Sequence, residues 1–168
     1  MPPSTRSDDV DRIVAAWRRE RPDLDVAPLA VLSRVSRLAR RLEKARGEAF
    51  SGQSLDGWEF DVLSALRRAG DPYELSPSQL VAETLVTSGT MTNRVDRLAA
   101  RGLVERHPSV TDGRGVIVRL TPAGLRTVDA ALEALLGHER TLLSELAPAE
   151  CHDLAALLRR LLRPLERS

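Results

Sequence analysis

Apolar residues recur at every third or fourth position along most of the chain, which is the spacing of one buried face on an α-helix. Two short stretches, Leu103–His107 and Val116–Leu120, are instead typical of strands and flank the turn residues Asp112-Gly113-Arg114-Gly115. The pattern therefore predicts a mainly α-helical fold with one small β-hairpin. Helices are expected over residues 7–21, 27–50, 56–69, 76–86, 88–101, 122–146 and 148–165.

The segment Ser76–Thr121 carries the strongest local signals. Ser76-Pro77-Ser78-Gln79 has a capping serine, a proline at the first helical position and a glutamine three residues after the cap, which together form a capping box. An apolar stripe follows, and Thr87-Ser88-Gly89 then offers a new cap before Gly102 ends the second helix. The stripe of the first helix is Leu80, Val81, Leu85 and Val86, and the buried face of the second is Met91, Val95 and Leu98.

Caps also mark the other helices. Ser7 is expected to cap the first helix, Asp56 the third, and Thr121-Pro122 repeats the cap and proline combination after the hairpin. These signals divide the chain into N-terminal helices (1–50), a helix-turn-helix with a hairpin "wing" (51–121) and C-terminal helices (122–168), which we expect to form one compact domain.

The polar face of the helix 88–101 has the chemistry of a DNA-binding surface. Hydroxyl, amide and guanidinium groups can bond both to phosphates and to base edges in the major groove. The turn between the two strands places Arg114 at the hairpin tip, beside Asp112. The candidate DNA-binding residues are Ser88, Thr90, Thr92, Asn93, Arg97, Arg101, Asp112 and Arg114.

Charge supports a local rather than a global DNA-binding surface. The net charge is only +1, although charged residues make up 29% of the 168 positions. Six arginines and three acids lie between Arg94 and Arg119, so basic residues accumulate where the candidate surface lies. A solvated helix face is the ordinary explanation of such a cluster, and the capped helix pair with its wing favours DNA binding over it.

The composition also indicates the cellular compartment and the kind of domain that the chain can form. One cysteine, Cys151, excludes an internal disulfide and suits a reducing compartment. The N-terminus lacks the features of a signal peptide, and no stretch is apolar enough for a membrane span, so a cytoplasmic protein is expected. With 42% hydrophobic residues, the chain can form one domain with a real core.

The segment resembles the MarR-type winged-helix transcription regulators. Asp112-Gly113-Arg114-Gly115 and the following Val116–Thr121 are similar to the family's wing motif, and the resemblance extends from about Leu29 to Leu162. It implies a winged helix-turn-helix fold and a regulator, most commonly a repressor, that binds double-stranded DNA.

Within that family the chain looks most like the urate-responsive subgroup, which has an added N-terminal helix with a tryptophan. The segments 59–63, 91–98 and 102–106 carry this similarity. The resemblance implies that Trp17 packs on the ligand and that Arg106 holds the ligand's negative charge. It also implies that the ligand disturbs Asp61, which is linked to the recognition helix through Arg94.

The residues themselves leave these roles open. On its own, Trp17 is most simply a core residue, and Arg94 and Arg106 could equally contact phosphate. Asp61 borders the core face of its helix, so its carboxylate needs a partner. If an anion repels this carboxylate and competes for the guanidinium groups, the link from Asp61 to Arg94 weakens and DNA affinity falls. Urate, a related purine or another small anion such as a tricarboxylate fits this scheme.

The terminal helices are too rich in leucine to be stable alone, which favours a homodimer built by the N- and C-terminal helices of two subunits. Two recognition helices related by a two-fold axis would bind a near-palindromic site. A bundle within one subunit is the alternative.

Other functions have weaker support. No nucleophile elbow, phosphate loop or zinc-protease motif is present, so an enzyme is not expected, and neither is a cofactor. His138, Glu139 and His152 form a conceivable metal site, and Cys151 a conceivable redox sensor, although the acids beside this cysteine discourage a thiolate. An architectural DNA-binding protein without an effector is the remaining alternative.

Overall fold

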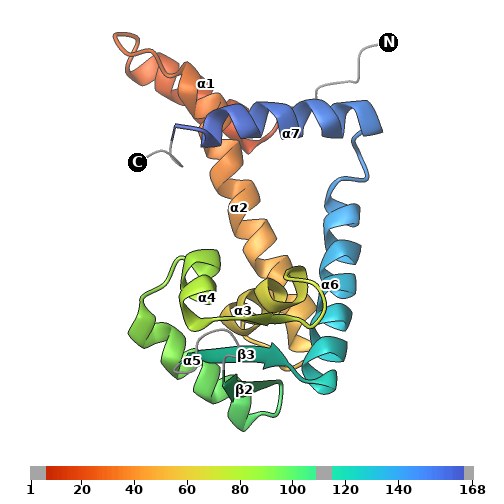
Figure 1. Cartoon of the computed structure of the whole chain (residues 1–168). Coiled ribbons are helices and arrows are strands. Elements are labelled where there is room, and N and C mark those ends of the chain that lie inside the picture. Colours follow the sequence, from red (N-terminus) through yellow and green to blue (C-terminus); the bar gives the residue numbers. More distant parts are fainter. Residues whose placement is uncertain (1–6, 109–114, 165–168) are drawn as a thin grey trace. The chain divides into compact units, whose positions relative to one another are not determined.

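A computed structural model describes residues 7–108 and 115–164. Contacts within the chain divide it into two compact units, residues 1–44 and 45–168. The helices are α1 (Asp9–Glu20), α2 (Ala27–Ser51), α3 (Gly57–Arg68), α4 (Pro77–Thr84), α5 (Ser88–Ala100), α6 (Pro122–Leu142) and α7 (Pro148–Leu162); the strands are β1 (Glu74–Leu75), β2 (Val104–Pro108) and β3 (Val116–Leu120) (Figure 1). All seven expected helices and both expected strands are therefore found. None of the helices in the described ranges is long and apolar enough to cross a membrane.

The first unit contains α1 and most of α2, which pack through a small apolar cluster. Val10 and Val14 of α1 and Val26 before α2 are buried and contact Leu29 and Ala30. Asp8 caps α1, since its carboxylate accepts hydrogen bonds from the amides of Val10 and Asp11 at 2.8 and 3.0 Å. The prediction that Ser7 caps this helix is wrong by one residue, because the carboxylate of the next residue, Asp8, accepts the bonds from the free amides.

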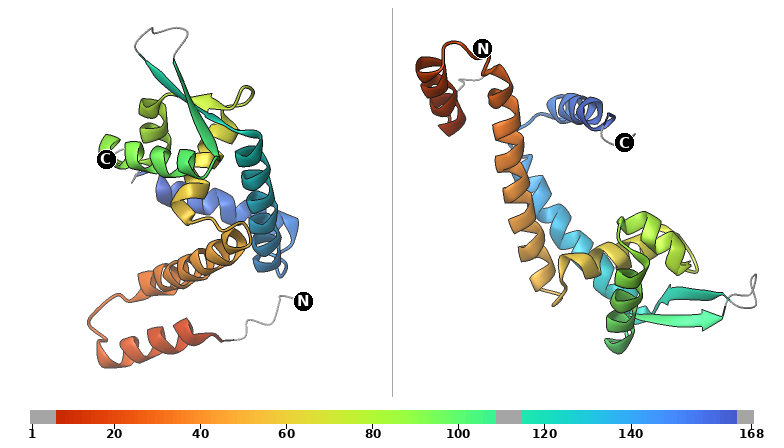
Figure 2. Two further views of the ribbon diagram at one scale, coloured as in Figure 1. Left: turned by 90° about the horizontal axis from the view of Figure 1, so that it is seen from below. Right: turned by 90° about the vertical axis from the view of Figure 1, so that its left-hand side faces the viewer.

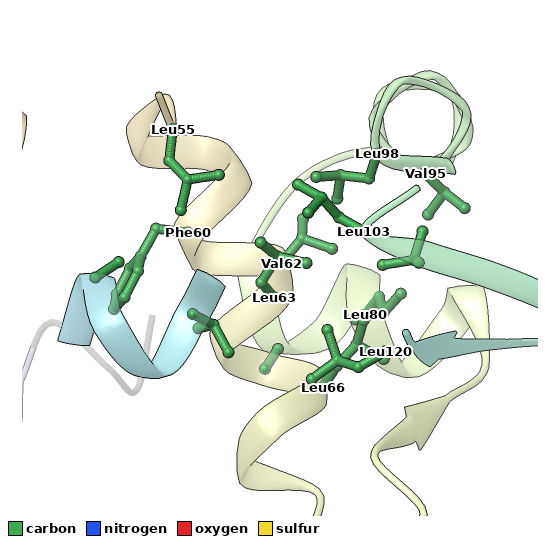
Figure 3. Close-up of a cluster of buried hydrophobic side chains, with 14 of the residues drawn as sticks. Leu55, Phe60, Val62, Leu63, Leu66, Leu80, Val95, Leu98, Leu103 and Leu120 are labelled. Carbon is green, nitrogen blue, oxygen red and sulfur yellow. The ribbon is translucent and has the colours of Figure 1, made fainter. Parts of the chain in front are cut away.

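The second unit is organised around α3, whose apolar residues lie at the centre of its core. Val62, Leu63 and Leu66 are fully buried. Figure 3 shows side chains from α3, α4, α5 and the strands gathered in one cluster. The pair of Phe50 and Phe60, with ring centroids 4.3 Å apart, joins the end of α2 to α3. The helix-turn-helix is thus supported by one continuous core.

The α4–α5 turn follows the expected caps. Ser76 and Gln79 form the predicted capping box, with the amide of Ser76 2.8 Å from the Gln79 side-chain oxygen. Leu85, however, ends α4 in the left-handed conformation and is 92% exposed, so its assignment to the apolar stripe is wrong. A helix whose last turn unwinds at this residue carries its side chain away from the face that Leu80 occupies.

The sheet has three strands in the order β1-β3-β2, all antiparallel. β1 was not expected from the sequence, because two residues are too few for a pattern. Its register places Glu74 opposite Arg119, and the carboxylate accepts from Nε of that arginine at 2.8 Å. Figure 2 shows β2 and β3 as a ribbon that projects from the helices of this unit, as a wing does.

Candidate nucleic-acid interface

Helix α5 has one buried face and one polar face. Thr87 caps it, and Met91, Val95 and Leu98 are buried in the core. Gly102 follows with a φ of +68°, a left-handed conformation that ends the helix at little cost for glycine. The core contacts fix which side of the helix faces outward.

The outward face carries most of the predicted DNA-binding side chains. Hydroxyl groups lie near the N-terminus of the helix, where free amides and the helix dipole favour a phosphate. An amide and a guanidinium group follow, and both can bond to base edges. The exposed members of the predicted set on α5 are Ser88, Thr90, Thr92, Asn93 and Arg97. The position and the chemistry of these side chains therefore agree with a helix that reads DNA. The other two predicted residues, Asp112 and Arg114, lie outside the described residues.

Arg101 was predicted to contact DNA, but the structure places it against α3. Its Nη1 atom lies 2.6 Å from the buried carboxylate of Glu59, and its Nη2 atom donates to the carbonyl of Ser54 at 2.9 Å. Arg101 therefore has a structural role that the sequence did not suggest, and its predicted contact with DNA stays a prediction.

Arg106 joins the wing to the recognition helix. Its Nη1 atom forms a 2.8 Å ion pair with Asp96, and its Nη2 atom lies 3.5 Å from the carbonyl oxygen of Thr92. The predicted anion-binding arginine therefore holds β2 against α5, and its predicted role toward a ligand stays untested.

Asp61 has a partner other than the predicted one. Arg46, near the end of α2, donates to its carboxylate at 2.9 Å and also lies over the rings of Phe50 and Phe60. Arg94 instead lies over the indole of Trp58, with 5.4 Å between the guanidinium carbon and the ring centroid. The sequence did not suggest Arg46 as a partner, although its four-residue spacing from Phe50 places both on one side of α2.

Trp17 lies on α1 in the first unit and is 49% exposed there, so it is not the core residue that its position alone suggested. Asp61 and Arg106 belong to the second unit. The ligand pocket that these three residues were predicted to form stays a prediction.

The alternative metal site gains no support, whereas the alternative thiol has an accessible position. Among residues 7–108 and 115–164, no group of three histidine, cysteine or acidic side chains is placed to hold a metal ion. Cys151 is a free thiol, partly exposed near the start of α7.

Comparison with known proteins agrees with this geometry. Residues 53–115, which include α3, the helix-turn-helix and β2, match the model of the MarR family. The chain is 40% identical over 152 residues to the HTH-type transcriptional regulator PecS of Dickeya dadantii, covering 90% of this chain and 92% of the relative. It belongs to the MarR family.

Two solved MarR-family structures extend the comparison. A mutant MarR from E. coli complexed with operator DNA is 27% identical, with a TM-score of 0.66 over 87% of this chain and 97% of that one. BpsR of Bordetella bronchiseptica, whose DNA binding is described as regulated by 6-hydroxynicotinic acid, is 27% identical, with a TM-score of 0.65 over 78% and 91%. The chain thus has the winged helix-turn-helix fold of this family.

Proposed function

We propose that this MarR-family protein is a transcriptional repressor that binds a near-palindromic operator as a homodimer and is released by a small anionic ligand. The observation that carries the proposal is the polar face of α5, where Thr92, Asn93 and Arg97 are exposed on a helix whose other side is anchored in the core. The solved complex of the E. coli relative with operator DNA supports the same use of the fold here.

The homodimer is supported by apolar side chains that the single chain leaves uncovered. Leu157 and Leu161 of α7 are 54% and 51% exposed, and Leu32 of α2 is 55% exposed. Helices with such faces are stabilised by burial against another surface, and a second copy of the same chain supplies a complementary one.

For the ligand, we propose urate or a related purine, held by Trp17 and Arg106 next to Asp61. The support is the resemblance to the urate-responsive subgroup, together with a relative whose DNA binding responds to another small aromatic acid. In this scheme the ligand displaces the Asp61 carboxylate from its partner and the change reaches α5, with a coupling free energy of roughly 1 to 3 kcal/mol. The partner in the structure is Arg46, so the path to α5 differs from the one through Arg94 that the sequence suggested.

A mobility-shift titration on the DNA upstream of the protein's own gene, with and without urate, tests the proposal. We expect a shifted complex that resists random competitor DNA and that urate dissociates, while urate quenches the fluorescence of Trp17. A complex lost equally to random DNA would indicate an architectural protein instead. Unchanged operator affinity together with unquenched fluorescence would exclude urate.

A redox-sensing regulator acting through Cys151 is the second candidate. Its support is the partial exposure of the thiol. Mild peroxide should then abolish DNA binding in the natural protein but not in Cys151→Ser, and equal binding by both would exclude it.

A further inference from the structure

The start of α3 contacts two arginines of the recognition helix and a third at its C-cap. Arg94, Arg97 and Arg101 are spaced three and four residues apart, so they lie along one side of α5. Each of the three contacts a side chain of the segment Asp56–Glu59. We call this four-residue segment the α5 seat.

Trp58 provides the aromatic part of the α5 seat. The guanidinium carbons of Arg94 and Arg97 lie 5.4 and 4.7 Å from its ring centroid. These are the distances of cation–π contacts, which favour arginine over an aromatic face. The indole itself is held because its Nε1 atom donates to Asp56 at 3.1 Å, and Arg97 lies 3.8 Å from the same carboxylate. Trp58 therefore limits the directions in which both arginines can point.

Glu59 provides the charged part. Its side chain is only 3% exposed, and Glu59 is the one charged residue classed as buried in the described ranges of the chain. A buried carboxylate is stable only with several partners. Glu59 has two, since the same oxygen, Oε2, accepts from Arg101 at 2.6 Å and from the amide of Asp56 at 2.9 Å. This fastens the C-terminal end of α5 to the N-terminal end of α3.

We propose that Trp58 and Glu59 are positioning residues for DNA recognition, which hold α5 at the angle that fits the major groove without touching DNA themselves. Arg97 is exposed beyond the indole, so it can turn from Asp56 to a phosphate when DNA binds. Arg101 stays with Glu59 and contributes no phosphate contact. The inference rests on the proposed DNA-binding function and adds to it which residues orient the recognition helix.

The test measures operator affinity at several salt concentrations for five variants of the protein. Trp58→Leu removes the aromatic face, and Trp58→Phe retains one. Glu59→Gln keeps the side-chain volume and an oxygen for the Asp56 amide but removes the charge. Arg97→Gln and Arg101→Gln are compared through their salt slopes, because each phosphate contact that is lost reduces the slope by about one, and circular dichroism confirms that each variant is folded.

We expect Trp58→Leu to weaken operator binding about tenfold and Trp58→Phe to restore most of it, since an aromatic face retains the contact with arginine. Glu59→Gln and Arg101→Gln should weaken binding while the salt slope stays unchanged, whereas Arg97→Gln should reduce the slope. If folded Trp58→Leu and Glu59→Gln bind as tightly as the natural protein, or if Arg101→Gln reduces the slope as Arg97→Gln does, the inference is wrong. If the natural protein itself binds no operator, the proposed function fails instead.

Discussion

At the scale of single residues, Gly124 at the start of α6 has no room for a side chain. A Cβ atom built there would lie 2.0 Å from the backbone oxygen of Leu103. Because that oxygen belongs to the backbone beside β2, it cannot move away cheaply. We expect Gly124→Ala to lower the free energy of unfolding by at least about 1 to 3 kcal/mol.

Gly137 is the matched control for this substitution, because it lies in the same helix with nothing within 4 Å of its Cβ position. Gly137→Ala should raise the free energy of unfolding by about 0.5 to 1 kcal/mol, as alanine favours a helix. Urea denaturation of both variants measures the difference, and equal effects would contradict the close approach of Gly124 to Leu103.

Asp61 offers a second test at this scale. Its ion pair with Arg46 is partly exposed, so the pair itself should be worth about 0 to 1 kcal/mol. In the absence of DNA and ligand, a double-mutant cycle of Asp61→Asn with Arg46→Gln should show coupling in the free energy of unfolding. The same cycle with Arg94→Gln in place of Arg46→Gln should show none. Coupling to Arg94 alone would restore the link that the sequence suggested.

These residues show how far sequence reasoning extends. The chemistry of the outward face of α5 was predictable, because the periodicity of Met91, Val95 and Leu98 fixes the buried side. The partners of Arg94 and Arg101 were not predictable, because a guanidinium group can bind a phosphate, a carboxylate or an aromatic ring. Only the position of α3 decides among them.

At the scale of elements, the cap of α1 makes the first unit sensitive to acid. The amide of Asp11 and the Arg34 guanidinium hold the pKa of Asp8 below its ordinary value of 3.8. The amide of Asp8 and the same arginine lower the pKa of Asp11. A carboxyl group with a lowered pKa stabilises the fold above the unfolded value and loses this contribution as the pH falls through the folded value.

We therefore expect α1 to loosen below about pH 4, as measured by the fluorescence of Trp17 in a Trp58→Phe protein without DNA. Arg34→Gln removes the partner shared by both carboxylates, so it should move the acid transition to higher pH. An unchanged transition would show that Arg34 does not stabilise the charged carboxylates.

Elements were largely predictable because caps and glycine are local signals. The Ser76 capping box, the Thr87 cap and the Gly102 terminus all depend on a few adjacent residues. The short strand β1 depends instead on its pairing with β3. The exposure of Leu85 depends on a left-handed backbone conformation that leucine rarely adopts. Both are set by tertiary structure.

At the scale of the whole molecule, the proposed homodimer should depend on the apolar face of α7. Leu157→Arg together with Leu161→Arg replaces two half-exposed leucines, and we expect the protein to become a monomer with weakened operator binding. Light scattering after size exclusion measures the mass. The control variant Leu85→Arg, at an exposed leucine outside the terminal helices, should leave the dimer intact. If the Leu157→Arg, Leu161→Arg variant is also a dimer, the interface does not lie on this face of α7.

The central claim is that the polar face of α5 binds DNA, and fluorescence anisotropy with a labelled fragment from upstream of the protein's own gene tests it most directly. We expect Thr92→Ala with Asn93→Ala to weaken binding to this fragment at least about tenfold relative to random DNA. Arg126→Gln, which removes one positive charge from the exposed surface of α6, should retain the preference. If the α5 variant discriminates the fragment from random DNA as well as the natural protein does, α5 is not the recognition helix.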